Sequence, residues 1–269
     1  MAPVTYEKRD RIAYVTLNRP EAMNAIDPEM HELLWETWED FRDDDAVDVA
    51  ILTGAGQGFC AGADLKKYIP PIIGEATPVW VRENVRTGIG GLTRGLHRIY
   101  KPVIAAVNGW ALAGGLETAL ACDIRVASER AMFGSFEARR GYHHGDGGIV
   151  RLVNACGAGV ALEMLLTAEP IDAQRALRCN LVSCVVPHER LMEEAERVAS
   201  QILRNSQRAV RSAKETILDV IGRPLDDQLR IEALNGYASA DTEETLGLLQ
   251  RFYDKTDAGR AGRNATPLE

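Results

Sequence analysis

The sequence predicts an α/β fold with a helical C-terminal extension. Two apolar runs of strand length, residues 47–52 and 103–107, each lead into a glycine-rich loop, and a helical pattern follows the second loop. Repeated strand, loop and helix units are typical of a sheet with helices on both faces. From about residue 158 onward the apolar spacing is helical, which predicts a helical region after the sheet.

The N-terminal elements can be predicted with their boundaries. Residues 4–8 and 12–17 have the pattern of two strands joined by a charged turn. Asp27 is typical of a helix N-cap and Pro28 of the first helical position, and apolar side chains follow at helical spacing as far as Phe41. The chain is therefore expected to enter its first helix at Asp27.

The remaining elements follow the same alternation. Residues 78–100 are predicted to form one helix, and a further helix is expected to begin at Gly114. A short strand over residues 132–134 is expected before Glu137. The predicted C-terminal helices cover residues 160–166, 173–177, 191–203, 209–221, 226–237 and 242–253.

Composition and charge disfavour several classes of function. The 269 residues are 46% hydrophobic and 26% charged, which is ordinary for a globular protein. A formal net charge of -8 disfavours nucleic acid and anionic membranes as partners. The N-terminus lacks the apolar core of a signal peptide, and no uninterrupted apolar run approaches about 18 residues. Five cysteines without CxxC spacing predict a reducing compartment, and we expect the cytoplasm.

The glycine-rich loop after residues 47–52 is a poor match to a nucleotide-binding motif. Gly54 and Gly56 follow a strand, but Phe59 stands where the dinucleotide fingerprint has its third small residue, and no GK[ST] pattern follows. Nicotinamide and nucleoside triphosphate binding are therefore not predicted. Glycine also allows the backbone to approach a ligand closely, because no side chain stands in the way.

Two such loops could form an oxyanion hole together. Ala63 follows Gly62 after one apolar strand, and Gly114 follows the next, at the expected start of a helix. An amide at a helix start has no intrahelical acceptor, and two amides aimed at one point stabilise a developing oxyanion. Tight turns without a chemical role are the alternative for each loop taken alone.

Two glutamates lie close to these loops in the sequence. Glu117 is one turn into the helix that begins at Gly114, and Glu137 follows the strand over residues 132–134. Small and apolar neighbours predict partial burial of Glu117, and buried carboxylates are suited to general acid–base work. The two carboxylates could move a proton and activate water beside an oxyanion hole, whereas a surface or capping role would explain either one alone.

Five stretches of the sequence together resemble the enoyl-CoA hydratase/isomerase (crotonase) superfamily. They are NRPEAMNAI from Asn18, GFCAGADLK from Gly58, KPVIAAVNGWALAGGLETALACDIRVA from Lys101, FGSFEARRG from Phe133 and LTAEPIDAQRAL from Leu166. The resemblance runs from about residue 3 to beyond residue 250, and the order and spacing of the stretches make it specific. The reaction is less specific, because this fold hosts many chemistries.

The resemblance implies a hydratase site. The Ala63 and Gly114 amides would bind the thioester carbonyl oxygen, Glu117 and Glu137 would be the catalytic pair, and the Gly145 amide would help to place the water. The presence of both glutamates favours an enoyl-CoA hydratase, which adds water across the 2,3 double bond of an acyl-CoA thioester. The implied CoA-binding residues are Ala61, Ala63, Asp64, Leu65 and Lys66, with Lys67 as a further phosphate contact.

The resemblance also implies the architecture and the partners. It predicts a crotonase-like core of ββα units in a spiral over residues 1–200, and a helical region over residues 201–269 that mediates trimerisation and helps to cover the CoA. A homotrimer or a dimer of trimers is the expected assembly. No cofactor is expected, because coenzyme A is part of the substrate, and no metal site is predicted.

Three places depart from the usual pattern of the superfamily. Phe136 stands where a small residue is more usual, Tyr142, His143 and His144 stand where an aliphatic pair and a proline are common, and Asp146 replaces a small residue. Phe136, His144 and Asp146 are therefore candidate substrate-pocket residues for a polar or bulky acyl group, and surface-facing histidines are the alternative. A metal site of His143, His144 and Asp146 is disfavoured, because HHGD lacks a standard ligand spacing.

Two other classes of function stay open at the level of sequence. One is another reaction at the same site: double-bond isomerisation, dehydration of a hydroxyacyl-CoA, or hydrolysis of a carbon–carbon bond or ring. The other is a non-catalytic RNA-binding or scaffold protein of the same fold, which the net charge and the intact glutamate pair oppose. A serine protease is disfavoured, because the chain has no GxSxG motif and Ser135 has no assigned base.

Overall fold

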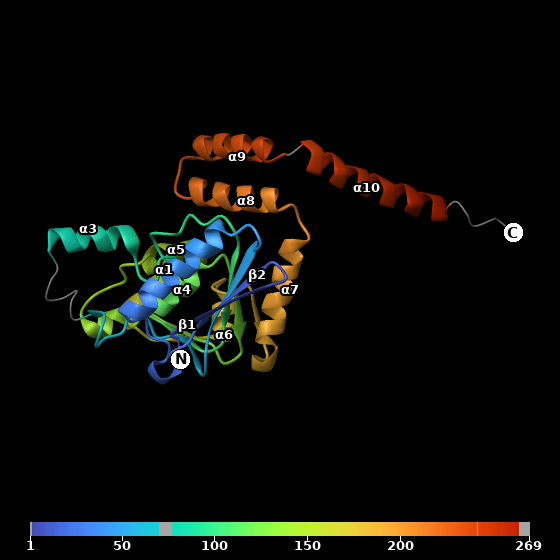
Figure 1. Ribbon diagram of the computed structural model, residues 1–269. Helices are drawn as coiled ribbons and strands as arrows, with labels where there is room; N and C mark the ends of the chain where they lie inside the picture. The colour runs from blue at the N-terminus through green and yellow to red at the C-terminus, as the bar shows by residue number, and fades with distance from the viewer. Residues whose placement is uncertain (1, 70–76, 241, 264–269) are drawn as a thin grey trace. The chain divides into compact units, whose positions relative to one another are not determined.

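The computed structural model describes residues 2–69, 77–240 and 242–263. The chain divides into two compact units, residues 1–204 (unit 1) and residues 205–269 (unit 2). Unit 1 contains both β-sheets, and the described part of unit 2 is helical, coloured orange to red in Figure 1. The predicted α/β fold with a helical C-terminal region is confirmed.

The described strands and helices alternate along unit 1. The strands are β1 (Val4–Arg9), β2 (Ile12–Leu17), β3 (Val49–Gly54), β4 (Gly58–Cys60), β5 (Val103–Val107), β6 (Trp110–Leu112), β7 (Ile124–Ser128), β8 (Met132–Gly134), β9 (Ile171–Asp172) and β10 (Cys184–Val186). The helices of unit 1 are α1 (Pro28–Asp43), α3 (Pro78–Thr87), α4 (Gly114–Ala121), α5 (Gly148–Thr167), α6 (Ala173–Arg178) and α7 (Leu191–Leu203), with 3-10 turns η1 (Pro20–Ala22), η2 (Glu137–Arg140) and η3 (His188–Arg190).

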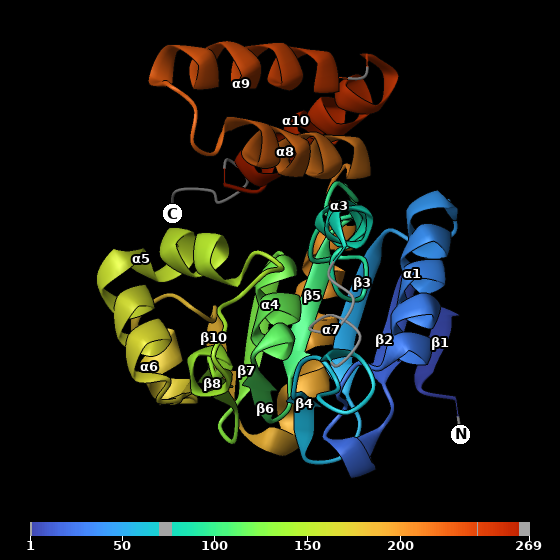
Figure 2. The same ribbon diagram turned by 90° about the vertical axis from the view of Figure 1, so that its left-hand side faces the viewer.

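The large sheet has six strands in the order β1-β2-β3-β5-β7-β10, and all neighbours are parallel except β1 and β2. Figure 2 shows this order, with α7 behind the sheet. Side chains alternate between its two faces, so Val49 and Ile51 pack with α7 while Ala50 and Leu52 join the larger core on the α1 side. Burial on both faces explains why β3 and β5 are apolar runs without alternation.

The small sheet has the order β4-β6-β8-β9, and β4, β6 and β8 are parallel to one another. Each of the pairs β3–β4, β5–β6 and β7–β8 gives one strand to each sheet, and a helix follows the second and third pairs. These pairs with their helices are the ββα units that the sequence predicts.

Helix α1 begins as the sequence predicts. Asp27 has extended backbone angles, and its side chain accepts a hydrogen bond from the Met30 amide at 3.0 Å. Leu34, Trp38 and Phe41 are fully buried on the face that packs toward the large sheet. The apolar spacing in the sequence therefore marks the buried side of this helix.

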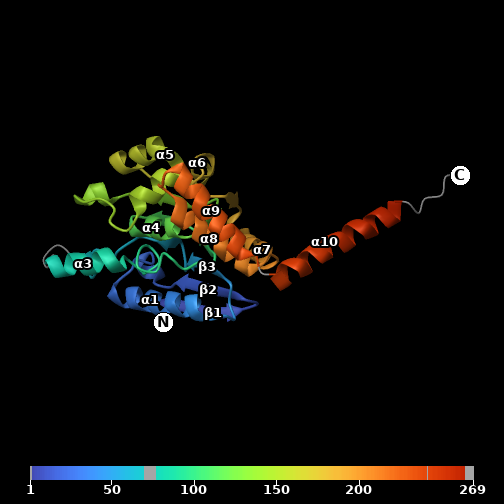
Figure 3. The same cartoon turned by 90° about the horizontal axis from the view of Figure 1, so that it is seen from above.

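Two predicted helices are wrong in extent. The helix predicted over residues 78–100 ends at Thr87, because Gly88, Gly90 and Gly91 have φ angles of 67°, 62° and 74° and turn the chain into a loop. Helix α5 begins at Gly148, well before the predicted residue 160, and has a kink at Gly157. Figure 3 shows α5 and α6 side by side at the edge of unit 1 remote from α1.

Unit 2 contains α8 (Gln207–Val220), α9 (Leu225–Ser239) and α10 (Thr242–Arg263). Helices α8 and α9 pack against each other as an antiparallel pair (Figure 1). A hydrogen bond of 2.9 Å joins Ser206, the N-cap of α8, to Glu244 on α10.

The Asp27 cap gives a stability prediction. Asp27 also lies 3.3 Å from Arg19 and 2.9 Å from Lys67, so its loss removes a cap and two ion pairs. We expect Asp27→Ala to lower the free energy of unfolding by about 1–2 kcal/mol, measured by urea denaturation. Asp27→Asn keeps an acceptor for the Met30 amide and should lose less. Equal stability of wild type and Asp27→Ala would contradict the cap.

Candidate active site

The site lies where the parallel strands of the small sheet end. Ala63 follows β4, Gly114 follows β6 and Glu137 follows β8. Because these strands are parallel neighbours, their carboxyl ends meet at one edge of the sheet. Three residues that are far apart in the sequence are therefore brought together by the repeat of the ββα unit.

The amides of Ala63 and Gly114 are adjacent. A Cβ atom added to Gly114 would lie 3.4 Å from the Ala63 nitrogen, and one added to Gly62 would lie 2.7 Å from the Gly114 nitrogen. Gly62 also has a φ of 91°, so both space and backbone conformation require glycine there.

Neither amide N–H makes a hydrogen bond of the neighbouring bridge or helix. Ala63 pairs with Ile26 as an isolated parallel bridge, in which the Ile26 and Asp64 amides make the hydrogen bonds, at 2.8 Å each. In a parallel bridge of this register the Ala63 N–H points away from Ile26. Gly114 is the first residue of α4, so its amide has no acceptor within the helix.

The turn before α4 is strained. Ala113 has φ 52° and ψ -124°, a region that residues with a Cβ rarely adopt. The start of α4 packs tightly on β4, since a Cβ on Gly115 would lie 2.0 Å from the Cys60 carbonyl oxygen. This close packing of α4 on β4 fixes the direction of the Gly114 amide.

Glu117 is buried, with 3% of its surface exposed, and is held by backbone amides. Its Oε1 accepts hydrogen bonds from the Asp146 amide at 2.7 Å and from the Gly148 amide at 2.9 Å. Gly148 is the first residue of α5, where amides lack intrahelical acceptors and the helix dipole favours negative charge. A helix start therefore compensates the burial of this carboxylate.

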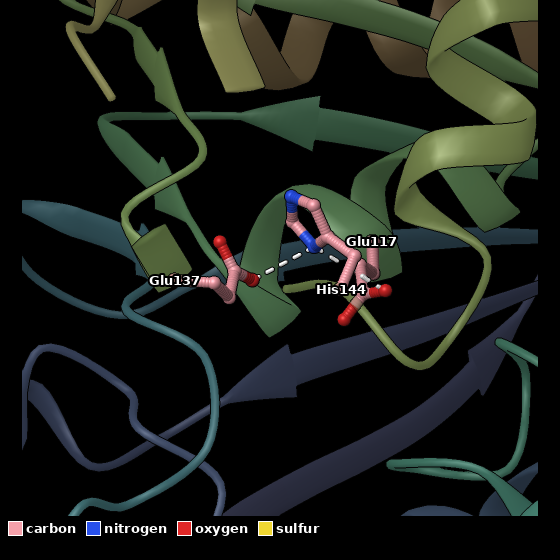
Figure 4. A group of neighbouring side chains, drawn as sticks. All are labelled: Glu117, Glu137 and His144. Atoms are coloured by element: carbon pink, nitrogen blue, oxygen red, sulfur yellow. Dashed lines mark ion pairs between the residues drawn. The ribbon is translucent and has the colours of Figure 1, made fainter. Parts of the chain in front are cut away.

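Glu137 is equally buried, with 4% of its surface exposed, at the start of η2. Ser135 donates a hydrogen bond to its Oε2 at 3.2 Å. The His144 Nδ1 atom lies 2.7 Å from Glu137 Oε1 and 3.3 Å from Glu117 Oε1, so the imidazole stands between the two carboxylates (Figure 4). The two glutamates thus share one ionisable neighbour.

His144 is the least expected member of this cluster. It is 5% exposed, so the expectation of a surface-facing histidine is wrong for His144, although His143 next to it is exposed. Burial by itself would lower the pKa of His144, but contacts with Glu117 and Glu137 outweigh it and raise that pKa to about 9. A protonated imidazole between two carboxylates is the charge state that this arrangement favours at neutral pH.

Asp146 lies behind this group. Its Oδ1 accepts from the Ile89 amide at 3.2 Å and lies 2.9 Å from Arg94 Nη2. Burial and the nearby charge of Glu117 raise the pKa of Asp146 to about 6, with Arg94 acting in the opposite direction. Asp146 thus touches the loop after α3 with its side chain and Glu117 with its amide.

Two further predicted residues lie at the rim. Gly145 is exposed, and its carbonyl oxygen accepts a hydrogen bond from Arg94. Phe136 is half-buried and packs over Gly134, with the Arg139 guanidinium 4.4 Å from its ring centre. Its bulk therefore takes up space over the end of β8, directly before Glu137 in the chain.

The loop predicted to bind CoA is ordered by Asp64. The Asp64 Oδ1 accepts from the Lys66 and Lys67 amides at 2.9 and 3.1 Å, and Oδ2 lies 3.2 Å from Arg19. In the same loop Ala61 is half-buried, and the side chains of Leu65 and Lys66 are exposed. The ammonium of Lys67 is held by Asp27, as described above, and is less well placed for a phosphate than sequence alone predicts.

Three side chains could hold a cation. One ligand atom each from Glu117, Glu137 and His144 lies within 4.8 Å of the others. This set differs from the His143, His144 and Asp146 set that the sequence brings to attention. The raised pKa of His144 indicates that a proton on the imidazole already supplies a positive charge here. We therefore keep the prediction that no metal is required.

Comparisons with known proteins identify the family. A model of the enoyl-CoA hydratase/isomerase family matches residues 7–260. The chain belongs to this family. It is 41% identical over 243 residues to the (E)-benzylidenesuccinyl-CoA hydratase of Thauera aromatica, covering 90% of this chain and 92% of that protein. The short-chain-enoyl-CoA hydratase of Clostridium acetobutylicum is 37% identical over 255 residues, covering 94% and 95%.

Solved structures of the enoyl-CoA hydratase/isomerase family have the same fold. The crystal structure of enoyl-CoA hydratase from Bacillus anthracis superposes with a TM-score of 0.83 at 35% identity, covering 94% of this chain and 96% of that one. The predicted crotonase-like fold and the predicted superfamily are therefore both confirmed.

The sequence did not predict several contacts around the two glutamates and Asp146. The Asp146 and Gly148 amides could have been inferred, because Gly147 and Gly148 precede an apolar helical pattern and a helix start offers free amides. Ser135 is two residues before Glu137, but nothing in the sequence orients its hydroxyl. Arg94 gives no signal at all, because its loop meets Asp146 only in the fold.

The raised pKa of His144 predicts a pH dependence of stability. Its folded-state pKa of about 9 exceeds the ordinary 6.5, so the stabilisation is fully present below pH 6.5 and is lost as the pH rises through 9. The free energy of unfolding of wild type should fall relative to that of His144→Gln over this window, by an amount on the order of 3 kcal/mol. Asp146 titrates below this window, at about 6.

Urea denaturation at a series of pH values measures this difference. His143→Gln is the matched control, because the neighbouring His143 is exposed, and its curve should run parallel to wild type. A constant difference between wild type and His144→Gln from pH 6 to pH 10 would contradict a buried imidazolium.

Proposed function

We propose that this chain is an enoyl-CoA hydratase that adds water across the 2,3 double bond of an acyl-CoA thioester. The observation that carries the proposal is a pair of buried carboxylates, Glu117 and Glu137, at the same sheet edge as the adjacent amides of Ala63 and Gly114. Both glutamates and both amides are what water addition next to a thioester needs.

In the proposed mechanism the amides bind the thioester and the glutamates transfer protons. The Ala63 and Gly114 amides donate to the thioester carbonyl oxygen and stabilise the negative charge that develops there. Glu117 and Glu137 accept a proton from water as its oxygen bonds to C3, and a proton is delivered to C2 as the enolate collapses. Gly145 is proposed to help place the water. One O–H bond and the π bond between C2 and C3 break, and one C–O and one C–H bond form.

The coenzyme A part of the substrate is proposed to lie against residues 61–66, where Lys66 is an exposed candidate for a phosphate contact. No cofactor is required in this scheme, because the thioester itself supplies the electron sink. The relatives named as hydratases of enoyl-CoA substrates support the acyl-CoA class. The relative from Thauera aromatica is named for a substrate with a bulky acyl group, which supports a bulky acyl substrate for this chain as well. Phe136 and His144 are proposed to lie beside the reacting carbons of that substrate.

Loss of either glutamate is expected to stop turnover. Glu117→Gln and Glu137→Gln should each lower kcat for crotonyl-CoA hydration by at least about 100-fold, the usual size of a general acid–base contribution. Turnover is followed by loss of the enoyl-thioester absorbance. Glu169→Gln is the control, because Glu169 is an exposed carboxylate paired with Arg139. Wild-type activity in both site variants, with unchanged melting, would refute the proposal.

The oxyanion hole can be tested by removing one amide hydrogen. Gly114 is the first residue of α4, a position at which helices tolerate proline, and proline puts a ring carbon in place of the N–H donor. Gly114→Pro should lower kcat by about 100- to 1,000-fold relative to Gly114→Ala, which adds a Cβ but keeps the amide. Equal kcat values in the two variants, both folded by circular dichroism, would argue against this donor.

We propose a homotrimer or a dimer of trimers in the cytoplasm. Unit 1 exposes apolar side chains of α5, and unit 2 exposes others on its own helices: Val150, Val153, Leu162 and Leu166, and Leu229, Leu234, Tyr237 and Phe252. Exposed apolar side chains in such number support subunit contact for each unit. By length and composition alone, helix α5 could cross a membrane. This is weak evidence for a membrane-spanning segment, because helices covered by protein pass the same test. Five free cysteines support a reducing compartment.

The assembly is tested by sedimentation velocity. Wild type should sediment as a trimer or hexamer, and Leu162→Asp or Leu229→Asp should shift it toward monomer, because each places a charge in a proposed apolar contact. A monomeric wild type at micromolar concentration would contradict the proposed trimerisation role of residues 201–269.

A further inference from the structure

Both ring nitrogens of His144 are buried polar atoms of the site. Neither ring nitrogen of His144 has a hydrogen-bond partner among the residues that the structure describes, although the side chain is almost completely buried. Nδ1 still faces two carboxylates, at 2.7 and 3.3 Å, although neither contact has the direction of a hydrogen bond. Nε2 has no such neighbour, and Figure 4 shows it turned away from both glutamates. A buried N–H without an acceptor costs free energy, so a bound group that accepts a hydrogen bond from Nε2 would be stabilised here.

The chemistry of the imidazole makes Nε2 a donor. Nδ1 faces two carboxylates and therefore carries a hydrogen. The raised pKa of His144 means that Nε2 also carries one at neutral pH, so the ring offers a charge-assisted donor. The acceptor that such a donor favours is an oxygen atom.

The ring is also held in place. A Cβ on Gly148 would lie 2.6 Å from the Cγ and Nδ1 atoms of His144 and 2.9 Å from the Glu117 Cγ atom. The imidazole thus packs directly on the start of α5, with Glu137 on another side. A fixed donor of this kind discriminates between ligands more strongly than a mobile one.

The imidazole lies close to the place proposed for the reacting carbons of the acyl group. Under the proposed function, C2 and C3 of the substrate lie within reach of both carboxylates, and the imidazole is in contact with both of them. Because Nε2 is turned away from both glutamates, it can meet only a part of the acyl group that extends past C2 and C3.

We propose that His144 is a specificity-determining residue whose Nε2–H donates a hydrogen bond to an oxygen that the acyl group carries beyond C3. The oxygen belongs to a carboxylate or to an uncharged carbonyl, and the two sources share this chemistry. The inference rests on the proposed function for the location of the acyl group, and it adds the class of substrate.

Binding of unreactive saturated thioesters tests the inference separately from catalysis. Calorimetry gives Kd for butyryl-CoA, which has no oxygen beyond the thioester, for glutaryl-CoA, and for the methyl ester of glutaryl-CoA. Wild type should bind at least one of the oxygenated ligands about 10-fold or more tightly than butyryl-CoA, the effect of one hydrogen bond from a charged donor. Preference for the acid over the ester assigns a carboxylate, and equal affinity assigns an uncharged oxygen.

Two variants separate the ring nitrogens. The amide nitrogen of asparagine and the Nδ1 atom of histidine are the same number of bonds from Cα. The amide nitrogen of glutamine corresponds in the same way to the Nε2 atom of histidine. His144→Asn should therefore lose the preference for the oxygenated ligand, with a Kd ratio near one, while His144→Gln should keep most of it. His143→Asn is the control for the exposed neighbour, and its ratio should equal that of wild type.

Two outcomes would overturn the inference: wild type without preference for either oxygenated thioester, or His144→Asn with the wild-type ratio. Failure of the proposed function has a different signature, since it would appear as no hydration of crotonyl-CoA or glutaconyl-CoA by wild type that still binds acyl-CoA. The Kd ratios report on His144 in either case.

Discussion

The burial of two carboxylates side by side is the constraint on which the rest of the site depends. Two negative charges in a poorly solvated place repel each other and lose hydration, so each needs compensation. Glu117 receives two amides from the start of α5, Glu137 receives the Ser135 hydroxyl, and the His144 imidazole contacts both. Gly148 is glycine because the ring and a glutamate occupy the space of its side chain. The acidic pair, the turn and the helix therefore form one unit.

The fold supplies this arrangement through repetition. Three consecutive β-strand pairs each give a short parallel strand to the small sheet, and the chain after each strand arrives at the same edge. Two of these segments present amides and the third presents a carboxylate. Since parallel strands share one direction, the repeat places groups from residues 63, 114 and 137 together without contacts between distant helices. The strain at Ala113 is located at this edge, directly before the Gly114 amide.

The sequence predicted those features that local chemistry determines. The Asp27 cap and the buried runs of β3 and β5 follow from residue type and spacing, and the family resemblance located the amides and both glutamates. The helix predicted beyond Thr87 was wrong, because three glycines at positive φ override a pattern that looks helical. The burial of His144 could not be predicted either. The turn that carries it brings the imidazole between Glu117 and Glu137, and the sequence does not show where these glutamates lie relative to that turn. Contacts between segments, such as Arg94 with Asp146, have no local signature.

A crystal structure of the protein with butyryl-CoA is the sharpest test of the proposed site, because it locates the thioester relative to the amides and the carboxylates together. In the proposed mechanism the thioester oxygen lies roughly 2.7–3.1 Å from both the Ala63 and the Gly114 nitrogen. C2 and C3 then face Glu117 and Glu137, with the His144 ring in contact with the acyl chain. A thioester oxygen bound elsewhere, or an acyl chain remote from both carboxylates, would contradict this mechanism.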